Sequence, residues 1–289
     1  MNGVDHIYWL NLERCIDRRA SMEKMLSDPC FRGIPATRIS GLDGARENIL
    51  DYVDSDVAFD EKIGFGGLCE KYHNVKSQYG CLVSHFRAMH HFSVHGTAGQ
   101  IALIFEDDMT LDLKSYWKKT IREIATDAPS DWGIIQLSYI VHRIPDETFT
   151  PILYNNTNAL YGIGAYIIKY EAACEFINCI YDDNSGKYLF LKSREPEFVY
   201  HISDHYIYSF IRGYCYRYPY FIYPYDQVST VNNSHLDFHN RSRAQIEAFL
   251  HERCVGIASD GRIWDCAIIS TFVAAAATFI WGVGRRIFR

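Results

Sequence analysis

The sequence predicts a domain of the α/β class with a mixed, mostly parallel central sheet flanked by helices, for three reasons. Apolar runs typical of buried strands alternate with segments of helical periodicity throughout residues 1–225. One run, residues 101–105, leads straight into Glu106, Asp107 and Asp108, and an open α/β sheet places its ligands at the carboxyl ends of its strands. The chain of 289 residues is 48% hydrophobic and 15% aromatic, which is enough for a sizeable core.

Strands and helices are expected in alternation along the chain. Five short apolar segments bounded by polar or turn residues are expected to be strands: 7–12, 36–39, 101–105, 132–137 and 159–168. Five segments with apolar residues on one face are expected to be helices: 18–26, 80–95, 115–125, 171–181 and 202–211. Residues 45–79 and 182–200 are polar, and we expect irregular structure there.

Composition excludes several classes of protein. The net charge of −6 argues against a nucleic-acid binder, which would carry a basic face. Nine scattered cysteines with no CxxC and no Cys/His zinc spacing indicate neither a disulfide framework nor a structural zinc. The sequence shows no basic segment followed by an apolar one at its start, so we expect no signal peptide and a catalytic domain facing the cytoplasm.

The three consecutive acids are the strongest indication of a site. Adjacent carboxylates repel each other and resist desolvation, and a divalent cation such as Mn²⁺ or Mg²⁺ would compensate both costs. If the strand alternation continues through them, Glu106 and Asp108 point to one side and Asp107 to the other. We therefore expect Glu106 and Asp108 to be the metal ligands. The alternative is an acidic loop that is solvated or caps the next helix.

Two further features are compatible with an anionic ligand. A basic turn that includes Arg14, Arg18 and Arg19 joins the first strand to the first helix, and a turn and a helix N-terminus can meet phosphates. Glycines interrupt the strand at 159–168, where Gly164 indicates a bulge or the close approach of a ligand. Each feature alone also fits a purely structural role.

The last part of the chain differs in character. Residues 266–284 are uncharged and mostly apolar, and Arg285, Arg286 and Arg289 follow. A membrane-spanning helix needs roughly 17–25 such residues, so we expect a C-terminal hydrophobic helix that anchors the protein to a membrane. The alternative is a buried terminal helix. The expected organisation is a catalytic domain over residues 1–255 and a tail over residues 256–289.

Four motifs in register give the chain a resemblance to glycosyltransferase family 25, which includes lipopolysaccharide-modifying enzymes and collagen galactosyltransferase domains. Residues 8–19 are similar to the family's "I-N-L-x-R-x-x-D-R-R" start, and residues 80–88 match its "G-C-x-x-S-H-x-x-A" helix. Residues 102–108 match its "A-L-I-x-E-D-D" strand, and residues 164–168 resemble its "G-x-x-A-Y-I-I" segment. The resemblance covers about residues 5–240.

This resemblance implies a GT-A fold, a nucleotide-sugar donor, a divalent metal and inversion at the anomeric carbon. It implies that Asp204 is the general base and that a downstream histidine, His235 or His239, completes the metal shell. The sequence departs from the family at Ser234-His235-Leu236, where the family often reads Ser-Asp-Ile. The residues expected to contact the donor are Asn11, Arg14, Arg18, Arg19, Asp43, Ser84, His85, Asp107 and Gly164.

The predicted function is therefore metal-dependent transfer of galactose or glucose from a nucleotide-sugar, expected to be UDP-linked, to a hydroxyl group of a glycan or protein acceptor. Two other readings of the residues stay open. One is a GT-A-like module that binds without turnover while tethered to a membrane. The other is a nucleotidyltransferase, because such enzymes also place acidic metal sites after strands.

Overall fold

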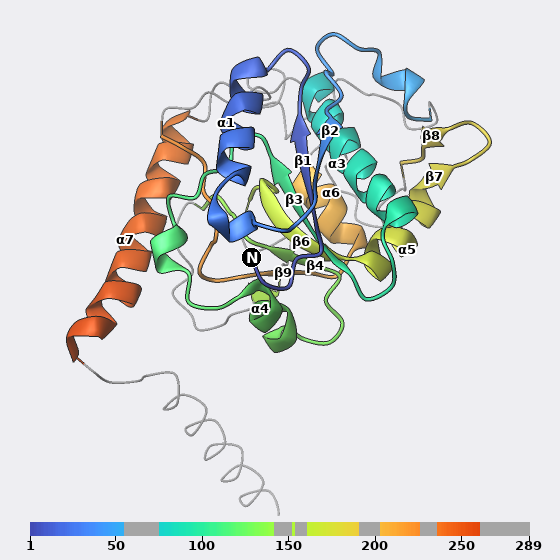
Figure 1. Ribbon diagram of the computed structural model, residues 1–289. Helices are drawn as coiled ribbons and strands as arrows, with labels where there is room; N and C mark the ends of the chain where they lie inside the picture. Colours follow the sequence, from blue (N-terminus) through green and yellow to red (C-terminus); the bar gives the residue numbers. More distant parts are fainter. Residues whose placement is uncertain (55–74, 142–151, 154–160, 191–202, 226–235, 261–289) are drawn as a thin grey trace, which may run out of the picture. The chain divides into compact units, whose positions relative to one another are not determined.

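The computed structural model describes residues 1–54, 75–141, 152–153, 161–190, 203–225 and 236–260 (Figure 1). The chain forms two compact units, Met1–Glu247 and Ala248–Arg289. The last helix, α7 (Leu236–Asp260), begins in the first unit and ends in the second. The predicted boundary at residue 255 stays a prediction.

A seven-stranded sheet in the order β2-β1-β3-β6-β4-β9-β5 lies at the centre of the first unit. Pairing is parallel for β1 with β2, β1 with β3, and β4 with β9, and antiparallel where β6 or β5 is involved. Five strands therefore point one way and two the other, which confirms a mixed, mostly parallel sheet. The strands are β1 (His6–Asn11), β2 (Ala36–Ser40), β3 (Ile101–Glu106), β4 (Ile134–Gln136), β5 (Ile152–Leu153), β6 (Ala165–Lys169) and β9 (Gly213–Cys215).

Helices cover both faces of the sheet, which gives three layers (Figure 1). Alternation along β1 shows how one strand serves two cores: Tyr8 and Leu10 pack with α3 (Val75–His95), α5 (Tyr170–Ile180) and α6 (Ser203–Phe210). Ile7 and Trp9 pack on the opposite face with α1 (Ile16–Leu26) and α4 (Ile121–Asp127). All four side chains are buried, so each face of the sheet is apolar.

Several expected elements have different bounds in the structure. The Gly-interrupted strand is shorter and is confined to β6 (Ala165–Lys169). The helix expected at 115–125 is a short 3-10 turn, η4 (Lys114–Tyr116), followed by α4, because Thr120 and Glu123 form a capping box that starts the helix at Ile121. The helix expected at 80–95 begins earlier, at Val75. The loop expected at 182–200 contains a small hairpin formed by β7 (Tyr181–Asp182) and β8 (Lys187–Tyr188).

Within the part of the chain that the structure describes, no helix combines the length and the apolar character needed to cross a membrane. The predicted hydrophobic C-terminal helix falls within residues 261–289, which lie outside the described residues.

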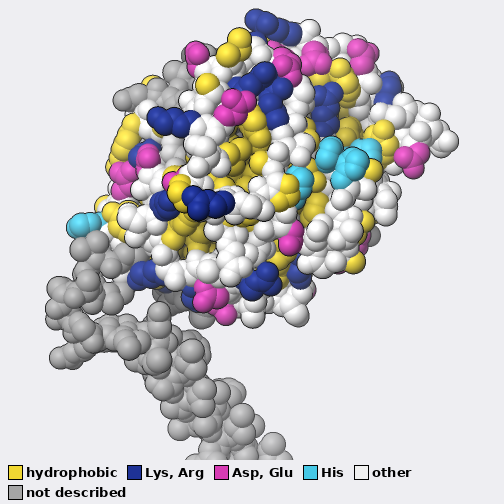
Figure 2. All heavy atoms as spheres, viewed as in Figure 1, with side chains coloured by type: hydrophobic (Ala, Val, Ile, Leu, Met, Phe, Trp, Pro, Cys, Tyr) yellow, Lys and Arg dark blue, Asp and Glu magenta, His cyan; other side chains and the backbone are white. Residues whose placement is uncertain are grey.

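Histidines at the far end of α3 should make stability depend on pH. The ring centroids of His91 and His95 lie 4.2 Å apart. Figure 2 shows a group of histidine side chains on the visible face of the molecule. The pKa of His6 is lowered by burial and then by the neighbouring His91 and His95. The pKa of His91 is lowered by burial and then by His95 and His90. The unfolded chain therefore takes up protons first as the pH falls below about 6.5, and protonation favours unfolding.

We expect the free energy of unfolding to decrease when the pH is lowered from 7.5 to 5.5. The His91→Gln variant should lose less stability than the unmutated chain over this interval. Urea unfolding at both pH values measures the difference. The exposed His251 provides a matched control, His251→Gln, that should behave like the unmutated chain. An identical loss of stability in His91→Gln and in the control would show that the α3 histidines do not contribute.

Candidate active site

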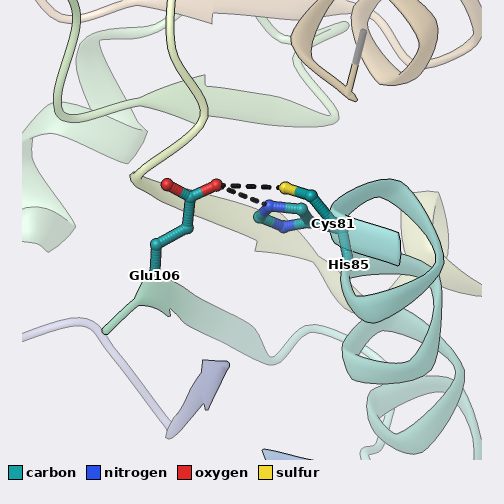
Figure 3. Close-up of side chains that lie close together, drawn as sticks. All are labelled: Cys81, His85 and Glu106. Atoms are coloured by element: carbon teal, nitrogen blue, oxygen red, sulfur yellow. Dashed lines mark hydrogen bonds and ion pairs between the residues drawn. The ribbon is translucent and has the colours of Figure 1, made fainter. Parts of the chain in front are cut away.

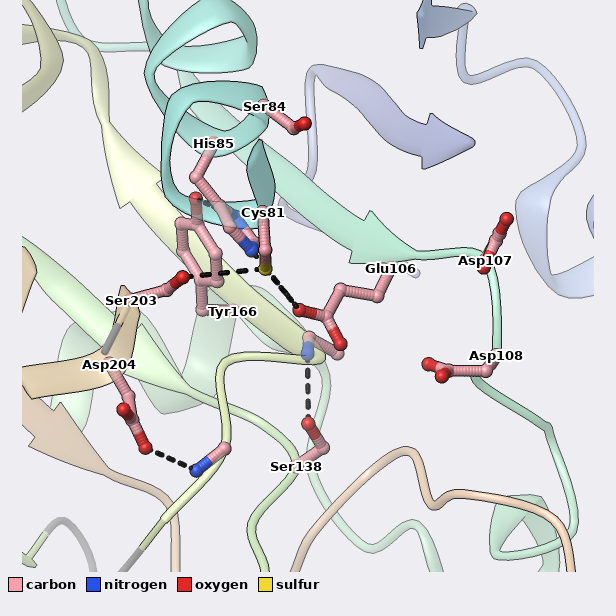
Figure 4. A network of polar contacts seen from close by, with 12 residues as sticks. Cys81, Ser84, His85, Glu106, Asp107, Asp108, Ser138, Tyr166, Ser203 and Asp204 are labelled. Carbon is pink, nitrogen blue, oxygen red and sulfur yellow. Dashed lines mark hydrogen bonds and ion pairs between the residues drawn. The ribbon is translucent and has the colours of Figure 1, made fainter. Parts of the chain in front are cut away.

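The site lies where β1 and β3 end. These strands are parallel, and Leu10 pairs with Glu106, so Asn11 and Asp107 emerge together at the same edge of the sheet. β3 ends at Glu106, and Asp107 and Asp108 follow in a turn. Strand alternation therefore does not apply to Asp108, contrary to the sequence argument. Figure 4 nevertheless shows the Glu106 and Asp108 side chains directed into the same space while Asp107 points away.

Arg18, on α1, joins two of the acids. Its Nη1 lies 2.8 Å from Oδ1 of Asp107 and 3.3 Å from Oδ2 of Asp108. The Arg18 side chain is only 16% exposed, so this charge acts in a poorly solvated environment where electrostatic interactions are strong. Arg18, which is predicted to contact the donor, therefore also pairs with two of the acids at this edge of the sheet.

Asp108 is the least compensated of the three acids. Its Oδ1 is buried and has no hydrogen-bond partner among the described residues. Burial, and then the nearby Glu106 carboxylate, raise the pKa of Asp108 well above the usual range of an aspartate. Arg18 opposes this shift but does not cancel it. An orphaned oxygen beside a second carboxylate is the arrangement that a divalent cation would complete.

Asn11 orients Asp107 through a hydrogen bond. The Asn11 side chain is buried, and its Nδ2 donates to Oδ2 of Asp107 at 2.6 Å and to the carbonyl of Cys15 at 3.1 Å. Its Oδ1 accepts from Nε of Arg38 at 3.0 Å and Nε of Arg19 at 3.3 Å. Asn11 and Arg19 therefore belong to a network that fixes Asp107, and Asn11 also lines the pocket.

Glu106 faces α3. Its Oε1 accepts from Cys81 Sγ at 3.4 Å and lies 3.3 Å from Nε2 of His85 (Figure 3). The other ring nitrogen of His85, Nδ1, lies 3.1 Å from the Tyr166 hydroxyl on β6. His85 is fully buried, so it contacts Glu106 from behind and does not line the pocket.

The loop after β2 forms the opposite wall. Ser84 of α3 accepts from the backbone N–H of Leu42 at 2.8 Å and donates to the carbonyl of Gly80 at 2.6 Å. Arg14 pairs with Asp43 across the mouth. The resulting pocket is lined by Leu10, Asn11, Leu12, Arg14, Arg18, Gly41, Leu42, Asp43, Gly44, Ser77, Cys81, Ser84, Glu106, Asp107 and Asp108.

Residues 4–187 match the family model described as Glycosyltransferase family 25 (LPS biosynthesis protein). The chain belongs to glycosyltransferase family 25. It is therefore a glycosyltransferase, as the motifs predicted, and the mostly parallel sheet with helices on both faces fits a GT-A-like fold. No curated protein matches the chain.

The glycosyltransferase pocket brings together most of the residues predicted for donor and metal binding. Asn11, Arg14, Arg18, Asp43 and Ser84 line it, together with the three acids of the β3 turn. These residues all lie within the segment matched by the family model. Asp204 lies beyond that segment, and His235 falls outside the described residues.

Gly164 is needed for packing. A Cβ atom at Gly164 would lie 2.5 Å from the Tyr223 hydroxyl and 2.6 Å from Cε of Met109, and the Gly164 carbonyl accepts from the N–H of Glu106 at 2.8 Å. The close approach indicated by this glycine is thus made by protein side chains. In turn, it places Glu106 and the Tyr223 hydroxyl on the same side of the site.

Asp204 begins α6 and is buried. Its Oδ2 accepts from the N–H of Gly162 at 2.6 Å, and its Oδ1 accepts from the N–H of His205 at 3.0 Å (Figure 4). Gly162 has a φ of +95°, which only glycine adopts readily, so Asp204 holds a turn that another residue would strain. Burial, and then Glu106, Asp108 and Asp204, raise the pKa of the Tyr223 hydroxyl.

Sequence reasoning missed three groups of this glycosyltransferase site: Cys81, Tyr166 and Tyr223. Cys81 stands one helical turn before His85, and this spacing is readable in the sequence. Tyr166 and Tyr223 are two of 21 tyrosines, most of which are expected in the core. Only the pairing of β3 with β6 and the position of Gly164 show that these two approach the acids.

Gly80 holds α3 against the pocket wall and offers a test of that packing. A Cβ atom there would lie 2.5 Å from the Leu42 carbonyl oxygen and 2.8 Å from the Gly44 nitrogen. Alanine normally stabilises a helix relative to glycine by about 1 kcal/mol. We expect Gly80→Ala instead to destabilise the protein by about 1–3 kcal/mol, because backbone must move.

Chemical unfolding of Gly80→Ala measures this effect. Gly41→Ala is the matched control, because its nearest contact is the flexible end of Leu12 at 3.1 Å and the strain is smaller. A Gly80→Ala protein that is more stable than the unmutated chain would mean that the loop and the helix are not held in contact.

Proposed function

We propose that the protein is a metal-dependent inverting glycosyltransferase that moves a hexose, galactose or glucose, from a UDP-sugar to a hydroxyl group of a glycan or protein acceptor. The observation that carries the proposal is the buried Oδ1 of Asp108, which has no hydrogen-bond partner among the described residues, in a pocket that also presents Glu106 and Arg18. UDP as the nucleotide rests on the family resemblance.

Asp108 and Glu106 are the residues that would hold the cation, Mn²⁺ or Mg²⁺. Their oxygens are hard donors suited to these ions, and the raised pKa of Asp108 reflects a lack of positive charge that a divalent ion would supply. When bound, such an ion neutralises negative charge on a leaving diphosphate. His235 stays a predicted third ligand.

Arg18 and Arg14 contribute the fixed positive charge of the pocket. Arg18 is held by Asp107 and Asp108, and Arg14 by Asp43, so neither side chain needs to be ordered when a ligand arrives. Fixed charges aimed at a group where charge develops stabilise the transition state more than mobile ones. Both arginines line the pocket, where a diphosphate would meet them.

We assign the general base to Asp204. What supports this is its burial at the start of α6 and its position in the same electrostatic surroundings as Glu106 and Asp108, around Tyr223. The test compares Asp204→Asn with Asp204→Ala. Asn keeps an acceptor for the N–H of Gly162 but loses the acceptor for the N–H of His205, so we expect a small loss of thermal stability. Loss of turnover in an Asp204→Asn protein that is still folded at the assay temperature supports the base. Full activity in that variant would leave Asp204 with only its structural contacts.

The donor is tested with a panel of UDP-, GDP-, CMP- and dTDP-sugars, each incubated with and without Mn²⁺ while release of the nucleotide is measured. The expected result is consumption of UDP-galactose or UDP-glucose in the presence of Mn²⁺. Asp131→Asn is the matched control and should retain activity, because Asp131 precedes β4, pairs with Arg212 and does not line the pocket. Consumption of a GDP- or CMP-sugar alone would contradict the assignment.

We further propose that residues 263–289 hold the protein on a membrane with the catalytic domain in the cytosol. Support comes from the apolar sequence of 266–284, whose burial would supply the driving force. The test is to express residues 1–260 and the full chain side by side and fractionate the cells. We expect only the full chain in the membrane fraction. Equal amounts of both in the soluble fraction would refute the anchor.

A further inference from the structure

Three potential metal-binding side chains meet behind the pocket wall. The ligand atoms of Cys81, His85 and Glu106 all lie within 4.8 Å of one another. Cys81 and His85 are one turn apart on α3, so their side chains project from the same face of the helix. Glu106 reaches them from the end of β3, as Figure 3 shows. Cys81 and Glu106 also line the pocket, which gives an ion a path to the cluster.

We propose that Cys81, His85 and Glu106 form a site for Zn²⁺ or a similar borderline cation. Thiolate, imidazole and carboxylate together are a zinc donor set, whereas a thiolate is a poor ligand for Mn²⁺ and Mg²⁺. The site shares Glu106 with the proposed Mn²⁺ site but does not use Asp108. It does not depend on the identity of the donor sugar.

Two of the three ligand-to-ligand distances match those around a tetrahedral ion, and the third lies within 4.8 Å. Ligand atoms bound to Zn²⁺ at its usual bond lengths lie about 3.3–3.7 Å apart. Oε1 of Glu106 lies 3.4 Å from Sγ of Cys81 and 3.3 Å from Nε2 of His85. Small adjustments of these side chains would therefore admit the ion, and the open pocket side would leave the fourth position to water.

A second layer of contacts already surrounds the cluster. The Tyr166 hydroxyl lies 3.1 Å from Nδ1 of His85, so its oxygen can accept a hydrogen bond from the Nδ1–H group when Nε2 binds a cation. The Ser203 hydroxyl donates to Cys81 Sγ at 3.3 Å and would stabilise a thiolate. Without the ion, Cys81 keeps its proton and donates to Glu106, so binding would release the thiol proton to solvent.

Co²⁺ is the probe for this site, because a cobalt–thiolate bond gives a charge-transfer absorption band in the near ultraviolet. The reduced, metal-free full chain is titrated with Co²⁺ and then with Zn²⁺. We expect the band to saturate at one Co²⁺ per chain and to disappear as Zn²⁺ displaces it. A folded chain that gives no band would overturn the proposal, even if it still binds UDP with Mn²⁺.

Variants locate the thiolate. Cys81→Ser should lose the band, whereas Cys174→Ser, a half-buried cysteine of α5, should keep it. Asp108→Asn should also keep it, which separates this site from the Mn²⁺ site. A band that persists in Cys81→Ser would place the metal on another cysteine and refute the site.

X-ray absorption of the zinc-loaded, unmutated chain needs no variant. One sulfur with nitrogen and oxygen neighbours is the expected shell, and a shell without sulfur would contradict the proposal. This measurement keeps the test decisive if Cys81→Ser does not fold.

Discussion

Replacing Asp108 by Asn is expected to lower kcat by at least about 100-fold, the usual cost of removing a group that stabilises developing charge in an active site. The amide cannot hold a hard cation as a carboxylate does, so the response of the enzyme to Mn²⁺ should also disappear. The fold should persist, since Asp108 carries a buried oxygen with no hydrogen-bond partner among the described residues. Turnover with the preferred donor, at several Mn²⁺ concentrations, measures the effect.

Removal of the Asp108 charge also relieves repulsion within the acidic turn. Because Glu106 and Asp107 contribute to the raised pKa of Asp108, we expect the thermal midpoint of Asp108→Asn to equal or exceed that of the unmutated chain in the absence of metal. Asp131→Asn again serves as the control for a carboxylate-to-amide change. If Asp108→Asn turned over substrate as fast as the unmutated enzyme, Asp108 would not be part of the active site.

Replacing Arg18 by Ala is expected to have the second-largest effect. It removes the cation within 2.8 Å of Asp107 and 3.3 Å of Asp108 and leaves three acids without that charge. We expect a loss of kcat/KM of about 100-fold, with a raised KM for the donor, because a diphosphate loses its positive partner while the negative charge of the pocket increases.

Arg18→Lys is the matched variant. Lysine keeps the charge but presents a single ammonium group in place of a planar guanidinium, so it should recover only part of the activity. Steady-state kinetics with varied donor, together with thermal unfolding, separate a binding effect from a loss of folding. Arg18→Ala kinetics indistinguishable from the unmutated enzyme would show that this guanidinium does not meet the donor.

Much of the fold follows from local sequence. β1 and β3 were predicted because their apolar runs are buried on both faces, which leaves a continuous signal. The start of α4 can be predicted from Thr120 and Glu123, which form a capping box. The helix predicted at 115–125 did not take this pair into account. The direction of β6 could not be read, since an antiparallel strand inserted between β3 and β4 has the same apolar pattern as a parallel one.

The site was predictable in its residue types but not in its contacts. The acids and arginines stood out because charge beside a buried strand is costly without a partner. Asn11 and Asp107 are 96 residues apart, and only the parallel pairing of β1 with β3 brings them within hydrogen-bond distance. Likewise, Cys81 and His85 gain their significance from the end of β3, which places Glu106 against their side of α3.

Calorimetric titration of UDP into the unmutated full chain, with and without Mn²⁺, tests most directly whether the acidic turn after β3 is a metal-dependent nucleotide site. The account predicts that Mn²⁺ tightens UDP binding at least about tenfold, a difference of 1.4 kcal/mol. It also predicts that Asp108→Asn removes this difference. Equal UDP affinity with and without Mn²⁺ in the unmutated chain, or a Mn²⁺ effect that persists in Asp108→Asn, would contradict it.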